Sequence, residues 1–337
     1  MTERFSRAIR DNPKIFVIVG LLGVLFLVTS LLDPSFRHPG NLSNTMRWVG
    51  LFGIISIGVS FVIITGGIDL SIGSLIALSG VLLPMLLVQG DPIFGETWMV
   101  PGAFAVVLGI AALIGLFHGL MVTKIGIQPF LVTLCGLFIY RGLARAAGSD
   151  QTQGFGGGDD FDWLKDLLVK HKVFDLVPMS FLVLIIVGIL AAILLNKTVY
   201  GRYLLAIGHN EEAAKFSGIK TDRIKIVAYV ICSTLAGLGG CLFTLDTNGA
   251  TPNSYGSFFE LYAIAGAVLG GCSLRGGEGA IFGVICGTAL VQVSESAVFF
   301  LGVEEVWKMA VIGTFILVGV VADELFRVWN DKRRRLG

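Results

Sequence analysis

The chain has 337 residues, of which 54% are hydrophobic and 15% charged, and its 25 basic and 24 acidic side chains leave a net charge of +1. Charged residues average about 25% in soluble domains, so this composition excludes a soluble enzyme, a nucleic-acid-binding protein and a disordered chain. It predicts an integral membrane protein embedded in the lipid bilayer. The 45 glycines suit close packing of helices in lipid, where small residues let backbones approach.

Uncharged apolar stretches, taken in chain order, predict the membrane-spanning helices, because about 20 such residues cross a bilayer core. The first stretch, 15–32, has 18 residues and no small-residue cleavage site after it, so we interpret it as an uncleaved span and not as a signal peptide. We expect an all-α fold, a single transmembrane domain over residues 1–337 with about ten transmembrane helices. The other nine predicted spans are 48–68, 70–90, 97–123, 125–140, 176–196, 226–245, 247–259 together with 261–274, 279–294 and 309–322.

The basic residues between these spans predict their orientation, since cytoplasmic loops carry an excess of Lys and Arg. Four basic residues precede the first span, and a run of four follows at 332–335. Loop 148–178 holds six acidic residues against three lysines, whereas loop 197–225 holds six basic residues against three acidic ones. We therefore expect both termini and loop 197–225 in the cytoplasm, and loop 148–178 on the extracytoplasmic side.

Several motifs that would carry chemistry are missing from the sequence. It contains no GxxxxGK[ST] phosphate-binding loop, no HExxH and no nucleophile elbow, and its five cysteines form no CxxC pair. We expect no catalytic residue, no metal site and no cofactor bound by this chain, and we interpret the cysteines as small packing residues. Charges within the predicted spans are sparse, which argues against a proton or sodium relay.

Loop 197–225 is the longest polar cytoplasmic segment between spans. Residues Glu211 to Phe216 are good helix formers, Asn210 is suited to the N-cap, and Gly218 is suited to ending the helix in the left-handed conformation. One interpretation is a solvated basic loop. The other is a short helix that docks onto a second protein.

The second interpretation is favoured by the run Glu212-Ala213-Ala214 followed by Gly218, which resembles the EAA–x–x–x–G loop of bacterial ABC-importer permeases. In that family the loop forms a coupling helix that sits in a groove of the ATPase subunit. The resemblance implies that loop 197–225 is a cytoplasmic coupling loop and that ATP is used by the partner subunit. The implied ATPase-coupling residues are Gly208, Asn210, Glu212, Ala213, Ala214 and Gly218.

Further segments resemble the monosaccharide branch of these permeases, which takes ribose, xylose, arabinose or galactose. They are Thr65–Ser74, Gln128–Leu134, Tyr140–Leu143, Glu260–Ala265 and Gly270–Gly279. The resemblance implies a multi-pass permease subunit of a binding-protein-dependent ABC importer in the bacterial inner membrane. Its implied partners are an ABC ATPase, an extracytoplasmic sugar-binding protein and a second permease subunit, identical or not.

The sequence departs from that family at three places. His209 stands where the family has glycine, and Ser294-Glu295-Ser296-Ala297 replaces the usual Asn-Gly-Leu after the ninth span. The outer loop 148–178 is atypical, and we interpret its glycine-rich, acidic part 148–162 as a flexible solvated loop. Since these differences lie on outward-facing surfaces, they leave the substrate and the docking partner open.

Asp69 lies in a Gly-Gly segment between two apolar runs, and a charge at the bilayer centre costs about 2.5–3.5 kcal/mol. It is therefore expected either to cap the next helix from a tight turn or to lie in a broken helix beside a translocation path. The pattern Gly66-Gly67-x-x-Leu70-x-x-Gly73 recurs from Gly270 to Gly277, which hints at internal symmetry. Glu260 is expected near the outer face at the start of the eighth span. The candidate path residues are Gly67, Asp69, Ser71, Phe130, Thr133 and Glu260.

Two alternative functions stay open at this point. A permease of the same superfamily could import branched-chain amino acids, nucleosides or a signalling furanose. An ion-coupled secondary transporter would need no ATPase, and the scarcity of intramembrane charge argues against it.

Overall fold

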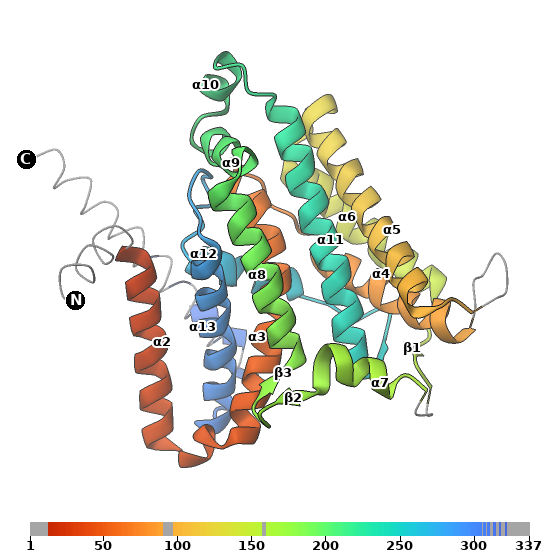
Figure 1. Ribbon diagram of the computed structural model, residues 1–337, viewed down its shortest axis with the longest axis vertical. Helices are drawn as coiled ribbons and strands as arrows, with labels where there is room; N and C mark the ends of the chain where they lie inside the picture. The colour runs from red at the N-terminus through yellow and green to blue at the C-terminus, as the bar shows by residue number, and fades with distance from the viewer. Residues whose placement is uncertain are drawn as a thin grey trace, which may run out of the picture.

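The computed structural model describes residues 13–89, 97–156 and 160–304, together with 306–307, 309–310, 313–314, 317 and 321. This part of the chain is mostly helical (Figure 1), as the composition predicts. Six helices are long and apolar enough to cross a membrane, and α5 reaches that length together with the π-helical turn η3 (Met121–Ile125). They are α3 (Pro39–Ile64), α5 (Val100–Leu120), α6 (Pro129–Ala147), α8 (Met179–Lys197), α11 (Thr221–Thr247) and α13 (Ile281–Phe300).

Three further apolar helices are shorter or less completely described. They are α2 (Pro13–Leu32), α4 (Ile72–Pro84), which continues through the π-helical turn η2 (Met85–Gln89), and α12 (Phe259–Leu269). The prediction of one continuous eighth span over 247–274 is wrong. At 1.5 Å per residue the 11 residues of α12 extend only about 16 Å, roughly half of a bilayer core. The tenth predicted span, 309–322, lies largely outside the described residues.

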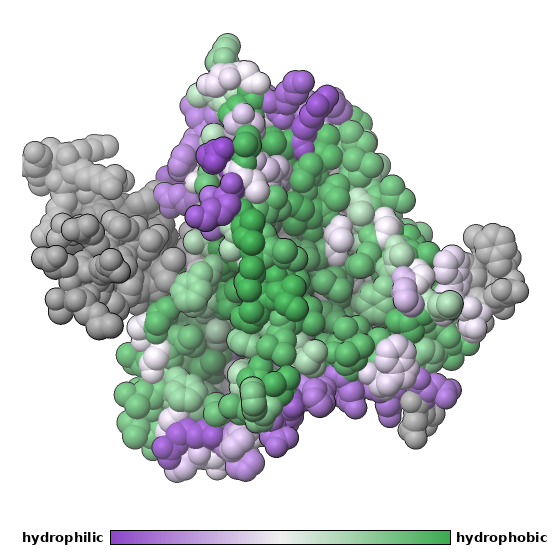
Figure 2. Space-filling view, viewed as in Figure 1, coloured by the Kyte–Doolittle hydropathy of each residue, from purple (hydrophilic) through white to green (hydrophobic). Residues whose placement is uncertain are grey.

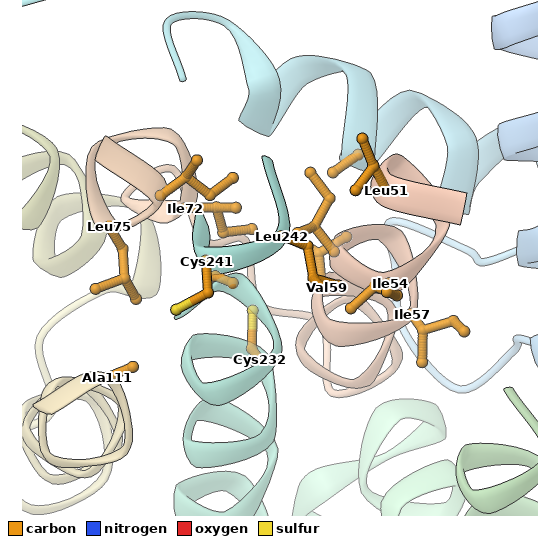
Figure 3. Close-up of a cluster of buried hydrophobic side chains, with 14 of the residues drawn as sticks. Leu51, Ile54, Ile57, Val59, Ile72, Leu75, Ala111, Cys232, Cys241 and Leu242 are labelled. Atoms are coloured by element: carbon orange, nitrogen blue, oxygen red, sulfur yellow. The ribbon is translucent and has the colours of Figure 1, made fainter. Parts of the chain in front are cut away.

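The core forms where α3 passes between α11, α12, α13 and α8. Because α3 is apolar on all sides, it is buried along most of its length. Its side chains meet those of α4, α5 and α11 in one continuous cluster (Figure 3). Four of the five cysteines are buried, as their interpretation as packing residues requires, whereas Cys135 is exposed. Side chains labelled in this cluster are Leu51, Ile54, Ile57, Val59, Ile72, Leu75, Ala111, Cys232, Cys241 and Leu242.

Glycine lets two of the long helices come unusually close. A Cβ on Gly115 of α5 would lie 2.5 Å from the carbonyl oxygen of Tyr229 in α11. One on Gly119 would lie 2.7 Å from the Cα of Ile226. The backbones of α5 and α11 therefore touch, which is the packing that the glycine content predicts for a membrane protein.

The surface carries a broad apolar belt. Hydrophobic side chains cover the middle of the molecule, and polar side chains gather at its two ends (Figure 2). The belt includes exposed aliphatic and aromatic residues of α2, α5, α6 and α8. A patch of this size is far beyond what a soluble monomer exposes, so the belt is the face that meets lipid.

The segment 148–178 contains short strands and helical turns. In its part 148–162, which the sequence predicted to be a flexible solvated loop, Gln153 and Phe155 are buried. Strand β1 (Gln153–Gly154) pairs antiparallel with β4 (Gly249–Ala250), which follows α11 nearly a hundred residues later. Strands β2 (Lys172–Val173) and β3 (Val177–Pro178) form a second pair. Between them α7 (Asp162–Lys165) and the turn η4 (Asp166–Lys170) pack under α11. The described part of this segment closes one end of the molecule (Figure 1).

At the opposite end α8 leads into two short helices, α9 (Val199–His209) and α10 (Glu211–Phe216). Thr198 caps α9, because its hydroxyl accepts a hydrogen bond from the backbone N–H of Gly201. A 3₁₀ turn, η1 (Pro34–Arg37), joins α2 to α3 at the far end. The chain thus carries a polar helical projection, α9 and α10, on the end opposite the β pairs.

Candidate functional site

Helix α10 forms where the sequence predicts it, with the same bounds. Oδ1 of Asn210 accepts the backbone N–H of Ala213 at 2.9 Å, which satisfies one of the free donors of the first turn. Gly218 has φ +82°, the left-handed conformation that ends a helix and that L side chains adopt with strain. The motif glutamate, Glu212, lies in the favourable first turn. The predictions of helix, N-cap and terminating glycine are confirmed.

An ion-pair network holds α10 against the body of the protein. The Glu211 carboxylate pairs with Lys225 of α11 through a short hydrogen bond and with Lys215 at 3.2 Å. Ala214 is buried, whereas Glu212 and Ala213 are exposed. The two alanines of the motif therefore have different roles: one packs inward and the other leaves the outer face of α10 smooth.

Phe216 is a feature that the sequence reasoning missed. Its side chain is 89% exposed at the end of α10, and apolar atoms stand out at this tip of the molecule (Figure 2). A single large aromatic side chain held out into solvent by an otherwise polar helix is suited to filling a pocket of another protein. Its position two residues after the EAA run was the available signal.

The Glu211 network gives a pH prediction. Burial raises the pKa of Glu211, but the bonds to Lys225 and Lys215 lower it more, so the net pKa lies below the ordinary value. A carboxyl with a lowered pKa stabilises the fold above its unfolded pKa, and this is lost as pH falls through the folded pKa. We expect the difference in thermal unfolding midpoint between wild type and Glu211→Gln to be constant from about pH 8 to 6 and to vanish in acid. A difference that disappears above pH 6 would contradict this.

Gly208, near the end of α9, packs closely against the interior of the protein. A Cβ on Gly208 would lie 1.9 Å from the carbonyl oxygen of Ile64 and 2.1 Å from the backbone nitrogen of Gly277. The backbone N–H of Gly277 itself donates a hydrogen bond to the carbonyl oxygen of Ile64 at 2.9 Å. Gly276 lies against both Gly66 and Gly208. The two Gly-Gly elements of the sequence therefore meet at one backbone junction beneath the coupling loop.

Asp69 lies in the non-helical link between α3 and α4 and is fully buried. Oδ1 accepts hydrogen bonds from the backbone N–H of Ser71 at 2.9 Å and from its hydroxyl at 2.6 Å, immediately before α4 begins. Oδ2 faces Nδ1 of His118 at 3.8 Å and Sγ of Cys232 at 3.7 Å. Nε2 of His118 is 2.8 Å from the Tyr140 hydroxyl. The carboxylate of Asp69 thus joins the link between α3 and α4 to α5 and α11, and through His118 to α6.

Most of the other candidate path residues surround the same link. The Thr133 hydroxyl is buried, 3.0 Å from the carbonyl oxygen of Pro129 and 3.2 Å from that of Ile68. Gly67 is buried, and a Cβ there would lie 2.8 Å from the hydroxyl of Tyr229. Phe130 is 48% exposed on the outside of α6. The structure brings Gly67, Asp69, Ser71 and Thr133 together, and their role in a path stays a prediction.

Glu260 lies in the first turn of α12, and its side chain is buried. Only 9% of the residue is exposed, and its Oε2 lies where a Cβ on Gly73 would come within 2.1 Å. The first turns of α4 and α12 therefore abut inside the protein, each after a non-helical segment that follows a long helix. Arg141 of α6 holds the second segment by donating to the carbonyl oxygens of Pro252 and Tyr255 at 3.0 and 2.5 Å.

Comparisons with known proteins relate the chain to transport permeases. Residues 41–320 match the family model described as branched-chain amino acid transport system / permease component. The chain is 35% identical to the ribose import permease protein of Bacillus subtilis (strain 168) over 314 residues, 92% of each chain. It is 32% identical to the galactose/methyl galactoside import permease protein of Escherichia coli (strain K12) over 314 residues, 90% of this chain and 92% of the relative. No solved structure matches the chain.

Proposed function

Since this chain belongs to the family of branched-chain amino acid transport system permease components, we propose that it is the membrane-spanning subunit of an ATP-driven importer of a monosaccharide. The observation that carries the substrate class is the similarity, over about nine tenths of the chain, to permeases named for ribose and for galactose. The family description names amino acids, but these relatives are named for sugars. The permease itself makes and breaks no covalent bond.

The topology that we propose has ten spans with both termini in the cytoplasm. Its support is the apolar belt, the six long helices, and the basic loop 197–225 on the end opposite the acidic segment 148–178. In this topology α12 is a half-length element, and α4 begins from the non-helical link in which Asp69 is buried. A membrane tolerates non-helical backbone where it is buried in protein or lines a water-filled cavity. Helix α10 then projects into the cytoplasm, and the β pairs face outward.

The partners that we propose bind the two opposite ends of the molecule. An ABC ATPase binds the outer face of α10, where Glu212, Ala213 and Phe216 are exposed. An extracytoplasmic sugar-binding protein docks on the opposite end, and a second permease subunit completes the path. Movement of α10 is carried by α9 to the junction at Gly208. From there it reaches the link that follows Ile64 and the link that contains Gly277. The first link leads from α3 into α4, and the second connects α12 to α13.

The coupling role gives a prediction at the tip of α10. We expect Phe216→Asp, and likewise Glu212→Lys and Gly218→Asp, to abolish both uptake and co-purification of the ATPase while membrane insertion stays normal. Removing a buried aromatic anchor from an interface typically costs about 2–4 kcal/mol of binding. Phe174→Asp is the matched control for co-purification of the ATPase, since Phe174 is 94% exposed in the turn between β2 and β3. Retained ATPase binding in Phe216→Asp would refute the assignment.

The proposed function is tested with the complex that co-purifies with the chain, reconstituted in proteoliposomes. Uptake of labelled ribose or galactose should require ATP and the binding protein, and it should survive collapse of proton and sodium gradients. Uptake that follows an ion gradient without an ATPase would show a secondary transporter instead. Uptake of branched-chain amino acids or nucleosides but of no sugar would overturn the substrate class.

A further inference from the structure

A cavity of about 550 Å³ lies between the first half of α3, the first turn of α12 and the last two turns of α13. Its lining runs along α3 from Asn41, in the first turn of that helix, to Phe52. Its volume falls in the range of small-molecule sites, about 300–1,000 Å³. No residue of the coupling loop and none of the predicted path residues lines it.

The wall of the cavity combines aromatic rings with uncharged polar groups. Trp48 and Phe52 of α3 stand one turn apart with ring centroids 6.1 Å from each other, and Tyr262 of α12 lies 5.5 Å from Phe52. Asn44, Thr45 and Gln292 add amide and hydroxyl groups. Rings that offer an apolar face beside a few hydrogen-bonding groups suit a ligand with C–H surfaces and hydroxyl groups.

Two of these polar groups are buried without a partner in the protein. Gln292 is 4% exposed and its Nε2 makes no hydrogen bond, and Thr45 is 9% exposed with its Oγ1 unbonded. Both residues line the same cavity, one from α13 and one from α3. A buried polar group that is left unpaired destabilises the fold. Two such groups on residues that line one cavity point to a ligand that supplies their hydrogen bonds.

The charge of the cavity distinguishes between classes of ligand. Among the described residues that line it, Glu295 is the only charged one. A zwitterionic amino acid would need a cationic partner for its carboxylate as well as an anionic partner for its ammonium group, and none of the described lining residues is Lys or Arg. A neutral polyol needs neither.

We propose that this cavity is the site at which the permease holds the monosaccharide during its passage, with Gln292 and Thr45 bonding sugar hydroxyl groups and Trp48 and Tyr262 stacking on its C–H face. The proposal rests on the proposed function. It places the sugar between α3, α12 and α13, away from the link that carries Asp69. It also gives a role to the region of Ser294–Ala297, where Glu295 and Ser296 line the cavity.

The test uses Gln292→Met in the full complex in proteoliposomes, with sugar transported per ATP hydrolysed as the main readout. Methionine keeps the size of the side chain and removes only the unpartnered amide. We expect thermal stability to be unchanged or raised and stimulation of the ATPase by loaded binding protein to persist. Sugar per ATP should fall about fivefold, the value of one hydrogen bond of ~1 kcal/mol. Thr45→Val should behave in the same way.

Gln153→Met is the matched control, because Gln153 is also buried but its Nε2 donates to the carbonyl oxygens of Gly148 and Gln151 at 2.9 and 3.2 Å. It should lower thermal stability and leave sugar per ATP unchanged. An unchanged ratio in both Gln292→Met and Thr45→Val would overturn the cavity assignment while leaving the proposed function intact. Failure of the wild-type complex to import any monosaccharide would overturn the proposed function, and the cavity assignment with it.

Discussion

Replacing Gly208 with alanine is expected to abolish uptake. The new Cβ would lie 1.9 Å from the carbonyl oxygen of Ile64 and 2.1 Å from the backbone nitrogen of Gly277. Both are backbone atoms, so no side-chain rotation can relieve the overlap, and the hydrogen bond between them at 2.9 Å has to open. Overpacking of this kind costs about 1–3 kcal/mol and sometimes more. The measurement is ATP-dependent sugar uptake together with the thermal stability of the purified complex.

Gly109→Ala is the control for this prediction. Gly109 is also a helical glycine, in α5, but nothing lies within 4 Å of the position of its Cβ. Because alanine favours helix by about 1 kcal/mol over glycine, this variant should be as active as wild type and slightly more stable. Normal uptake by Gly208→Ala would show that α9 does not transmit the movement of α10 through this junction.

The second large effect is expected at Asp69, where alanine should reduce uptake to background. Alanine removes the acceptor of two bonds from Ser71, its N–H and its hydroxyl. A buried donor left without an acceptor costs about 1–3 kcal/mol. Asp69→Asn keeps an oxygen that accepts both bonds, so it should be far less damaging. Uptake and the unfolding midpoint of the three proteins, measured in the same membranes, decide between these outcomes.

Asp33→Ala is the control for the local geometry. Oδ1 of Asp33 accepts a hydrogen bond from the backbone N–H of Ser35, two residues later, at 2.8 Å, just as Asp69 accepts one from Ser71. This turn is exposed, so water can replace the bond. It should retain uptake and stability. If Asp69→Asn is as inactive as Asp69→Ala and yet of wild-type stability, the charge of Asp69 itself takes part in transport, and its interpretation as a structural cap is wrong.

The sequence predicts best what depends on short range. The bounds of α10, its cap at Asn210 and its end at Gly218 depend on neighbours within one or two turns, and all three are confirmed. The long apolar runs likewise predict where the long helices lie, because a bilayer requires length and hydrophobicity above all. The membrane class follows from composition alone.

What the sequence could not predict depends on contacts between distant segments. Composition does not distinguish a full membrane span from a shorter helix with a non-helical segment beside it. The sequence therefore predicts one crossing over 247–274, although α12 covers only Phe259–Leu269. The sequence shows the Gly-Gly recurrence, but only the fold shows that Gly66 and Gly276 lie against each other. The unpartnered amide of Gln292 is visible only once three helices enclose it. The exposure of Phe216 likewise required the tertiary position of α10.

The pairing of β1 with β4 has a consequence for how the chain is assembled in the membrane. Residues 153 and 250 can meet only after both α8 and α11, which lie between them in the sequence, have been inserted. Until then the first strand has no partner, and the closure of so long a loop makes its folding a late event. The order of synthesis thus leaves the outer segment unfinished while the next two helices enter the bilayer. Its folded state marks a chain whose insertion has passed residue 250.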